Sequence, residues 1–134
     1  LNGLLKQYLQ DYEEVYDYRN IEVTIDEQDI FNVTINESLA VALLTNLLKN
    51  AFVHNIDGGH IRITVTKNSI TFRNSGVKNP LDKEHIFERF YQGTKKEGST
   101  GLGLAIADSI CRLQHLSIRY YFEQKEHCFE ISRQ

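Results

Sequence analysis

The chain has 134 residues, of which 41% are hydrophobic and 25% charged, and its formal net charge is -3 at pH 7. This size and balance predict one soluble globular domain with a core of its own. An acidic chain without a stripe of Lys and Arg excludes binding held by bulk attraction to nucleic acid, so we expect no nucleic-acid partner. The sequence holds no signal-peptide pattern and no apolar run long enough to cross a bilayer. Because it begins at Leu1 in a helix-like pattern, we expect a piece of a longer protein.

The first part of the chain predicts two helices separated by two strands. Apolar residues at three- and four-residue spacing predict an amphipathic helix over 1–16. Alternating residues predict strands at 21–25 and 31–35, which we expect to pair as a hairpin. Asn36 is suited to cap the next helix, whose apolar pattern covers 39–53.

The second part of the chain predicts mostly hairpins. The expected elements are strands 60–66 and 69–73, a short helix from Pro80 to Arg89 or Phe90, a helix over 104–113, and strands 117–122 and 128–132. We expect each strand pair to be antiparallel, the last one turning over residues 124–126. Helices and strand pairs in this order predict an α+β, two-layer α/β sandwich, with a mixed, mostly antiparallel sheet covered on one face by helices.

Three glycines stand within six residues, from Gly98 to Gly103, directly before the predicted helix 104–113. Glycines expose backbone N–H groups, and the start of a helix carries partial positive charge. The segment is therefore suited to phosphate oxygens. By itself it is equally consistent with a tight loop that lets a helix pack closely.

Polar residues recur one turn apart on the predicted helix 39–53. Asn46, Asn50 and approximately His54 share one face of an otherwise apolar helix. Asparagine is a poor helix former, so two in line need a reason. A neutral amide oxygen can bind Mg²⁺ beside a triphosphate without adding negative charge. The alternative is a polar stripe that faces solvent.

The strand 69–73 runs into Asn74 and Gly76. Such an end can place one hydrogen-bonding side chain in a pocket while the glycine leaves room for a flat ring. An ordinary turn is the alternative. Further on, Tyr91 precedes a polar loop whose Lys95 and Lys96 are suited to a lid that reaches phosphates, although such lysines are more often simply solvated.

In this order, the four segments resemble the N, G1, F and G2 boxes of the catalytic, ATP-binding domain of sensor histidine kinases. This is the Bergerat fold that gyrase, Hsp90, MutL and histidine kinases share. The resemblance covers 31–132, and its most specific parts are 46–51, 86–90 and 98–106. It implies a catalytic domain over 17–134, with 1–16 either the end of a dimerisation region or the first helix of the domain itself.

The resemblance implies ATP and Mg²⁺ as cofactors. The implied nucleotide-binding residues are Asn46, Asn50, His54, Asn74, Gly76, Tyr91, Thr100, Gly101, Leu102, Gly103 and Leu104. Asn50 matches the family's magnesium ligand. Candidates for phosphate contact are Arg89, Lys95 and Lys96. Cys128 stands on the last strand, where relatives often carry a small hydroxyl residue, and its contact with adenine is left open.

Three positions depart from the family's pattern. Asn74 replaces an aspartate that accepts a hydrogen bond from the adenine amino group, and the lost charge costs about 1 kcal/mol. Val53 stands where relatives usually have a lysine aimed at the phosphates, and Gln92 where many have an arginine. We therefore expect weak ATP affinity.

The resemblance also implies which chemistry the domain serves. Members that hydrolyse ATP carry a glutamate base at position 46, which the amide of Asn46 cannot replace. A histidine kinase needs no such base, because its acceptor is a histidine ring that is normally followed by an acidic residue. None of the five histidines here is followed by Asp or Glu. We therefore expect a protein-histidine kinase fragment with no catalytic residue beyond its nucleotide site and with its phosphoacceptor elsewhere.

The implied partners are a histidine-containing dimerisation domain of the same protein and a response regulator receiver domain. The parent is expected to be a membrane-anchored homodimer with this domain in the cytoplasm. The alternative is a degenerate nucleotide-binding or scaffold module with weak or no kinase activity. An anti-sigma-type serine kinase shares the fold but normally keeps a glutamate near position 46, which counts against it.

Overall fold

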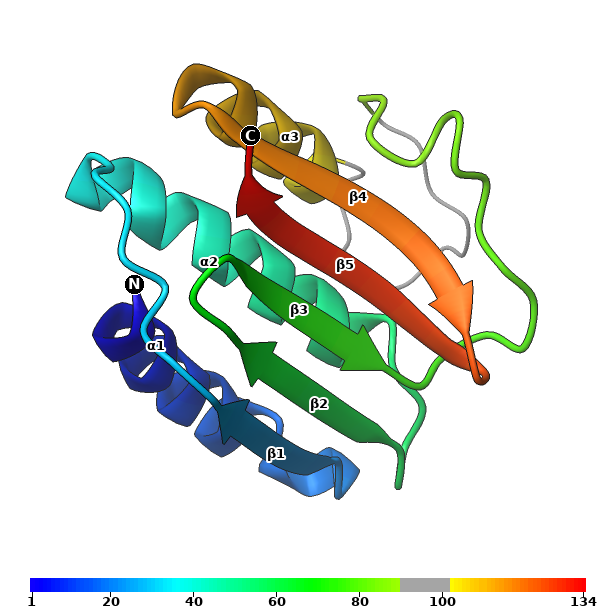
Figure 1. Cartoon of the computed structure of the whole chain (residues 1–134). Helices are drawn as coiled ribbons and strands as arrows, with labels where there is room; N and C mark the ends of the chain where they lie inside the picture. The colour runs from blue at the N-terminus through cyan, green and yellow to red at the C-terminus, as the bar shows by residue number, and fades with distance from the viewer. Residues whose placement is uncertain (90–101) are drawn as a thin grey trace.

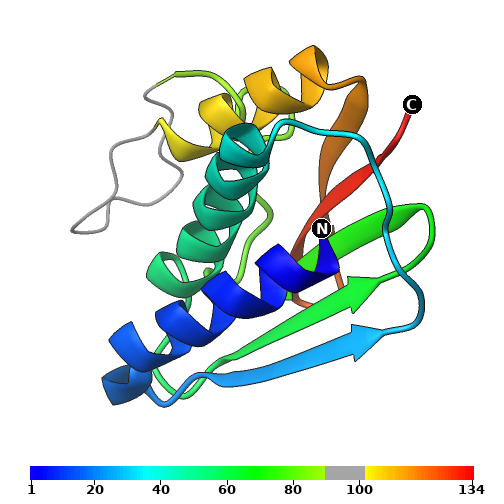
Figure 2. The same ribbon diagram turned by 90° about the vertical axis from the view of Figure 1, so that its left-hand side faces the viewer.

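The computed structural model describes residues 1–89 and 102–134. Within them the chain forms three α-helices, one 3-10 helix and a five-stranded sheet. The elements are α1 (Asn2–Val15), η1 (Asp17–Arg19), β1 (Glu22–Glu27), α2 (Glu37–Val53), β2 (His60–Val65), β3 (Ser69–Asn74), α3 (Gly103–Leu113), β4 (Leu116–Glu123) and β5 (Glu126–Arg133). Figure 2 shows the helices on one face of the sheet. The predicted α+β two-layer sandwich is confirmed.

The sheet has the strand order β1-β2-β3-β5-β4 (Figure 1). β1 and β2 are parallel, and the other neighbours are antiparallel. The predicted hairpins β2–β3 and β4–β5 are confirmed. The last turn is one residue shorter than predicted, because Glu126 already pairs with Glu123. Gln124 and Lys125 form this turn with φ of 51 and 63, the left-handed conformation that two-residue hairpin turns use.

The prediction of a strand at 31–35, paired with 21–25, is wrong. β1 pairs with β2 in parallel, and residues 28–36 form no strand. The N–H groups of Gln28 and Asp29 both donate to the Val65 carbonyl, and the chain then leaves the sheet. The N–H of Phe31 donates to the Asn2 side chain of α1 at 3.0 Å. Burial does alternate along 31–35, and Phe31 is buried. The alternation arises because Phe31, Val33 and Ile35 pack on the apolar core, not because the segment pairs as a strand.

The prediction of a short helix from Pro80 to Arg89 or Phe90 is also wrong. Residues 83–89 form turns, and Phe90 lies outside the described residues. Among the described residues of this segment one α-helical bond is formed, from the Ile86 N–H to the Asp82 carbonyl at 2.9 Å, beside two i→i−3 bonds of the turns. A single turn fixes several dihedral angles for one hydrogen bond, so it does not extend without further packing.

The core lies between the helices and the sheet, and α1 contributes to it. Leu5 and Leu9 of α1 are buried in the same apolar cluster as α2 and the strands. Tyr16 of α1's C-cap stacks on Phe52 of α2 with ring centroids 5.4 Å apart. The amphipathic helix predicted at 1–16 is confirmed, and it packs directly against α2.

Arg19 holds the C-terminal end of α2. Its guanidinium donates to the carbonyl of Asn55 at 2.7 Å and to that of Phe52. It also pairs with Asp57 at 2.8 Å. The last carbonyls of a helix have no partner within the helix and carry partial negative charge. Arg19 therefore stabilises the end of α2 that approaches the β3 end.

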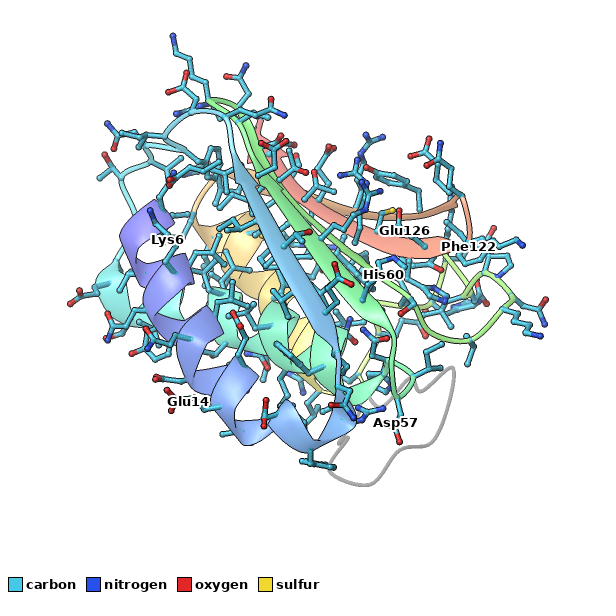
Figure 3. The ribbon with its side chains drawn as sticks, turned by 90° about the horizontal axis from the view of Figure 1, so that it is seen from below. Lys6, Glu14, Asp57, His60, Phe122 and Glu126 are labelled. Carbon is cyan, nitrogen blue, oxygen red and sulfur yellow. The ribbon has the colours of Figure 1, made fainter. Side chains whose placement is uncertain are left out.

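The face of the sheet opposite the helices carries paired charges. Glu126 accepts from the Arg62 Nε at 2.9 Å and contacts the His60 ring at 2.7 Å (Figure 3). These contacts, the Arg62 bond first, lower the pKa of the Glu126 carboxyl. On the same face, Arg119 pairs with Glu130 at 2.7 Å. No helix of the described residues covers this face.

Both cysteines are buried free thiols. Burial raises the pKa of Cys111 to about 12 and that of Cys128 to about 11. The thiolate is the reactive form, so neither is activated. Among the residues that the structure describes, every helix is too short or too polar to cross a bilayer.

Candidate functional site

The helix α2 carries the predicted polar face. Asn36 caps it as predicted, because its side chain accepts from the Leu39 N–H at 3.2 Å. Asn46, Asn50 and His54 are all half-buried, on a helix that is mostly apolar and buries eight of its 17 residues. The face is therefore not a stripe that points freely into solvent.

Asn46 lies against the start of α3. Its amide nitrogen donates to the Ala42 carbonyl at 2.7 Å, which fixes the side chain. A Cβ at Gly103 would lie 3.1 Å from the Asn46 Oδ1. The glycine thus permits a close approach of α3 to α2. Asn46 and Gly103, which are far apart in the sequence, meet in the fold.

Asn74 ends β3 with an unsatisfied acceptor. The side chain is 2% exposed, and its Nδ2 donates to the Ser75 carbonyl at 2.8 Å. A carbonyl only accepts, so the nitrogen must face Ser75 and the oxygen must face elsewhere. That buried Oδ1 has no hydrogen-bond partner among the described residues. Such atoms are rare in folded proteins, because each costs about 1–3 kcal/mol.

Gly76 stands between α2 and β5. A Cβ there would lie 2.9 Å from the His54 carbonyl oxygen and 3.2 Å from the His127 Cδ2. Any other residue would therefore push the segment after β3 away from α2. The glycine brings the Asn74 strand end, His54 and His127 together.

Asn55 and Ser75 fix this junction, and the sequence analysis missed both. The Asn55 amide donates to the Ala51 and His60 carbonyls at 3.1 and 3.0 Å. Its oxygen accepts from the Ser75 hydroxyl at 2.6 Å, and the side chain is fully buried. An asparagine just after a helix signals a cap, but no sequence signal pairs it with a serine twenty residues later.

His127, not Cys128, is the neighbour of Asn74. Cys128 pairs with Arg73, while His127 pairs with Asn74. Successive residues of a strand face opposite sides, so His127 shares the helix-covered side with Asn74 and Cys128 faces the other. The His127 ring is 3% exposed, and burial lowers its pKa. Cys128 therefore lies on the face of the sheet opposite the one that Asn74 occupies.

The glycine-rich segment is described only from residue 102. Leu102, Gly103 and Leu104 are half-buried, and the first turn of α3 carries no acidic residue. The predictions for Tyr91, Lys95, Lys96, Thr100 and Gly101 fall outside the described residues, as does Gln92.

Two positions bear on phosphate contact. Arg89 is exposed, and Val53 is buried in α2. Position 53 therefore serves the core here and presents no cation.

The contacts place Asn50 between two of the predicted segments. It lies one helical turn from Asn46, which meets α3, and one turn from His54, which meets the β3 end. A turn of four residues spans about 6 Å. The amide oxygen of Asn50 thus lies on α2 between two contacts of that helix, one with the positive end of α3 and one with the strand end that carries the buried acceptor of Asn74. This donor set suits a divalent cation, phosphate oxygens and an amino group.

Comparison with known proteins gives the family of this α+β domain. The family described as "Histidine kinase-, DNA gyrase B-, and HSP90-like ATPase" matches residues 35–132. The chain belongs to this family.

Within that family, the catalytic domain of the histidine kinase ThkA has a similar structure, with a TM-score of 0.84 and 26% identity over 98% of this chain and 90% of that one. A second ThkA structure, in complex with the response regulator protein TrrA, matches with a TM-score of 0.77 and 25% identity over 100% of this chain and 40% of that one. The chain is a catalytic domain of the histidine kinase type.

Two sequence relatives are longer proteins. The heme sensor protein HssS of Staphylococcus aureus is 34% identical over 90% of this chain, which spans 27% of HssS. The sensor histidine kinase RppB of Synechocystis is 43% identical over 56% of this chain and 18% of its own length. The chain thus spans about a quarter or less of these relatives.

Proposed function

We propose that this domain binds Mg·ATP, with the adenine amino group donating to the Oδ1 of Asn74. The buried, unsatisfied Oδ1 is the observation that carries the proposal, since a bound amino group supplies the donor that this atom lacks. The amide nitrogen is held by Ser75, so the side chain cannot turn to donate to a guanine oxygen without losing that bond. Asn74 therefore selects for adenine.

The phosphates lie between α2 and the start of α3 in this proposal. Asn50 supplies an oxygen ligand for Mg²⁺, which neutralises phosphate charge when bound. The N–H groups at the start of α3 face the phosphates, and no acidic residue in its first turn opposes them. Asn46 has no basic group to activate water, so the domain holds ATP for transfer and does not hydrolyse it efficiently.

The whole protein transfers the phosphoryl group to a histidine of a separate dimerisation domain, in a phosphorelay. HssS and RppB are longer than this chain, and ThkA has been solved with a response regulator, which supports a receiver domain as the next partner. The parent is proposed to be a membrane-anchored homodimer with this domain in the cytoplasm. The burial of Leu5 and Leu9 in the common core supports α1 as the first helix of the catalytic domain itself.

Calorimetric titration of the folded domain with Mg·ATP tests the proposal. We expect weak but measurable binding, and weaker binding of GTP. If the folded domain gives no heat of binding at millimolar Mg·ATP, the proposal that it binds Mg·ATP is contradicted.

A degenerate, non-catalytic module is the second candidate. The burial of Val53, where relatives carry a phosphate-facing lysine, favours it. The full-length protein separates the two: ATP binding without labelling of a histidine supports the second candidate, and autophosphorylation excludes it.

Replacing Asn74 by alanine is expected to remove the preference for adenine. Inosine triphosphate has a carbonyl where ATP has its amino group, so the wild-type domain should bind it more weakly than ATP. One lost hydrogen bond in a buried site is worth about tenfold in affinity. Asn74→Ala should lower ATP affinity by that factor and bind both nucleotides equally. The exposed Asn68→Ala serves as the control. A variant that keeps the ATP preference would show that Asn74 does not bind the base.

A further inference from the structure

A chain of hydrogen bonds links the segment 77–81, which follows the Asn74 strand end, to β4 and β5. The His127 Nε2 lies 2.7 Å from the Val77 carbonyl oxygen. The His127 Nδ1 lies 2.7 Å from the Tyr120 hydroxyl, which accepts from the Leu81 N–H at 2.9 Å. Both ends of the segment are thus held by two residues of the sheet.

The hydrogen-bond partners fix which atom carries the proton in each bond of this series. The Val77 carbonyl can only accept, so the Nε2 of His127 carries the proton. In a neutral ring the Nδ1 is then an acceptor, and the Tyr120 hydroxyl donates to it. The Tyr120 oxygen keeps its lone pairs for the Leu81 N–H. One arrangement of protons therefore satisfies all of these groups, and it requires a neutral imidazole.

The held segment adjoins the proposed base site. Gly76, one residue before it, lies between the His54 carbonyl and the His127 ring. Asn74, two residues further back, is the cross-strand partner of His127. A segment released from His127 would free Gly76 and, beside it, the Ser75 carbonyl that orients the Asn74 side chain, while Asn74 itself stays paired in the sheet.

We propose that His127 and Tyr120 are positioning residues for nucleotide binding, which act by holding residues 77–81 against the sheet. The proposal rests on the proposed function. Neither residue needs to touch the nucleotide. Their effect passes through the backbone of 76–77, which sets where the Asn74 oxygen lies.

The hydrogen bond between Tyr120 and His127 depends on pH. Within the described part of the chain, the groups that face the imidazole are the Tyr120 and Phe122 rings of β4, Asn74 of β3 and the backbone of 76–77, and none of them carries a formal charge. A protonated ring donates from both nitrogens, so the Tyr120 hydroxyl loses its acceptor. Burial lowers the pKa of His127 below its usual 6.5. The bond from the Tyr120 hydroxyl to Nδ1 is therefore complete above about pH 6.5 and is lost as the pH falls toward the lower pKa of the folded state, while the bonds to Val77 and Leu81 remain.

Two amides separate the roles of the two ring nitrogens. His127→Gln places an N–H near the position of Nε2 and keeps the bond to Val77. His127→Asn places an oxygen near the position of Nδ1 and keeps only the bond to Tyr120. Tyr120→Phe removes the hydroxyl from both Leu81 and His127. Thermal unfolding of each variant checks that it folds.

Affinity for Mg·ATP and hydrogen exchange of the Leu81 amide are the two measurements. We expect His127→Asn and Tyr120→Phe to weaken binding about fivefold to tenfold and to speed exchange at Leu81, and His127→Gln to stay within about twofold of wild type. Because a protonated ring and the His127→Gln side chain keep the same bond to Val77, the ratio of wild-type to His127→Gln affinity should stay within about twofold as the pH falls below 6.5, and protonation of ATP itself cancels in this ratio.

The outcomes are distinct. If His127→Asn and wild type show equal Mg·ATP affinity and equal exchange at Leu81, His127 does not hold residues 77–81. A His127→Gln variant that binds Mg·ATP as weakly as His127→Asn would also overturn the proposal. If the wild-type domain binds no nucleotide, the proposed function fails alone. Exchange at Leu81 then decides whether these residues hold the segment.

Discussion

Replacing Asn50 by alanine is expected to abolish the magnesium dependence of ATP binding. Asn50 lies one turn from the contact with α3 and one turn from the contact with the β3 end, so its oxygen is placed for a cation beside the phosphates. Mutating a residue that only supports a metal ligand commonly lowers metal affinity about tenfold to hundredfold, and mutating the ligand itself lowers it at least as much. We expect a loss of this order for Mg·ATP and little change for ATP in a chelator.

Lys49→Ala is the matched control. Lys49 is exposed on the same turn of α2, but it points about 100° away around the helix. Its loss should change the affinity by less than about twofold, since alanine favours the helix as well as lysine does. Calorimetry with and without magnesium measures both variants. If Asn50→Ala binds Mg·ATP as tightly as wild type, Asn50 is not the metal ligand.

Replacing Leu5 by alanine is expected to destabilise the whole domain by about 2–5 kcal/mol. Leu5 belongs to α1, is fully buried, and packs in the same cluster as α2 and the strands. Truncating it leaves a cavity in the one core that the described residues form. A typical domain is stable by only about 5–15 kcal/mol, so the loss is large.

Gln7 offers the comparison, because it is exposed on the same helix. Gln7→Ala should alter the free energy of unfolding by no more than about 0.5 kcal/mol. Urea unfolding followed by circular dichroism gives both values. A Leu5→Ala variant as stable as wild type would mean that α1 is detached in solution and belongs to a preceding region.

The predictions that held depend on contacts between neighbours in the sequence. Helical spacing gave α1, α2 and α3, and alternation with polar turns gave the β2–β3 and β4–β5 hairpins. Both errors concern contacts with parts of the chain that lie outside the local segment. Residues 31–35 alternate like a strand and follow β1, but β1 takes its partner from beyond α2. The turns at 83–89 resemble a helix locally but lack the packing that would extend one.

The candidate site divides in the same way. The shared face of Asn46, Asn50 and His54 follows from helix geometry, and the structure places all three at partly covered positions. Their neighbours do not follow from it. Gly103 reaches Asn46 across more than fifty residues, and His127 reaches Asn74 across a similar distance. Cys128 was considered for the base site because relatives often carry a small hydroxyl residue there, and the sequence does not show which face of the sheet it occupies.

The sequence by itself determined the class of fold, the helix that carries the amides and the order of the segments around it, because periodicity and glycine placement act over a few residues. The tertiary structure alone decided which strand β1 joins, which face His127 occupies and which acceptor stays unpaired at Asn74. Those outcomes depend on pairing between distant strands, where a shift of one residue moves every side chain to the opposite face.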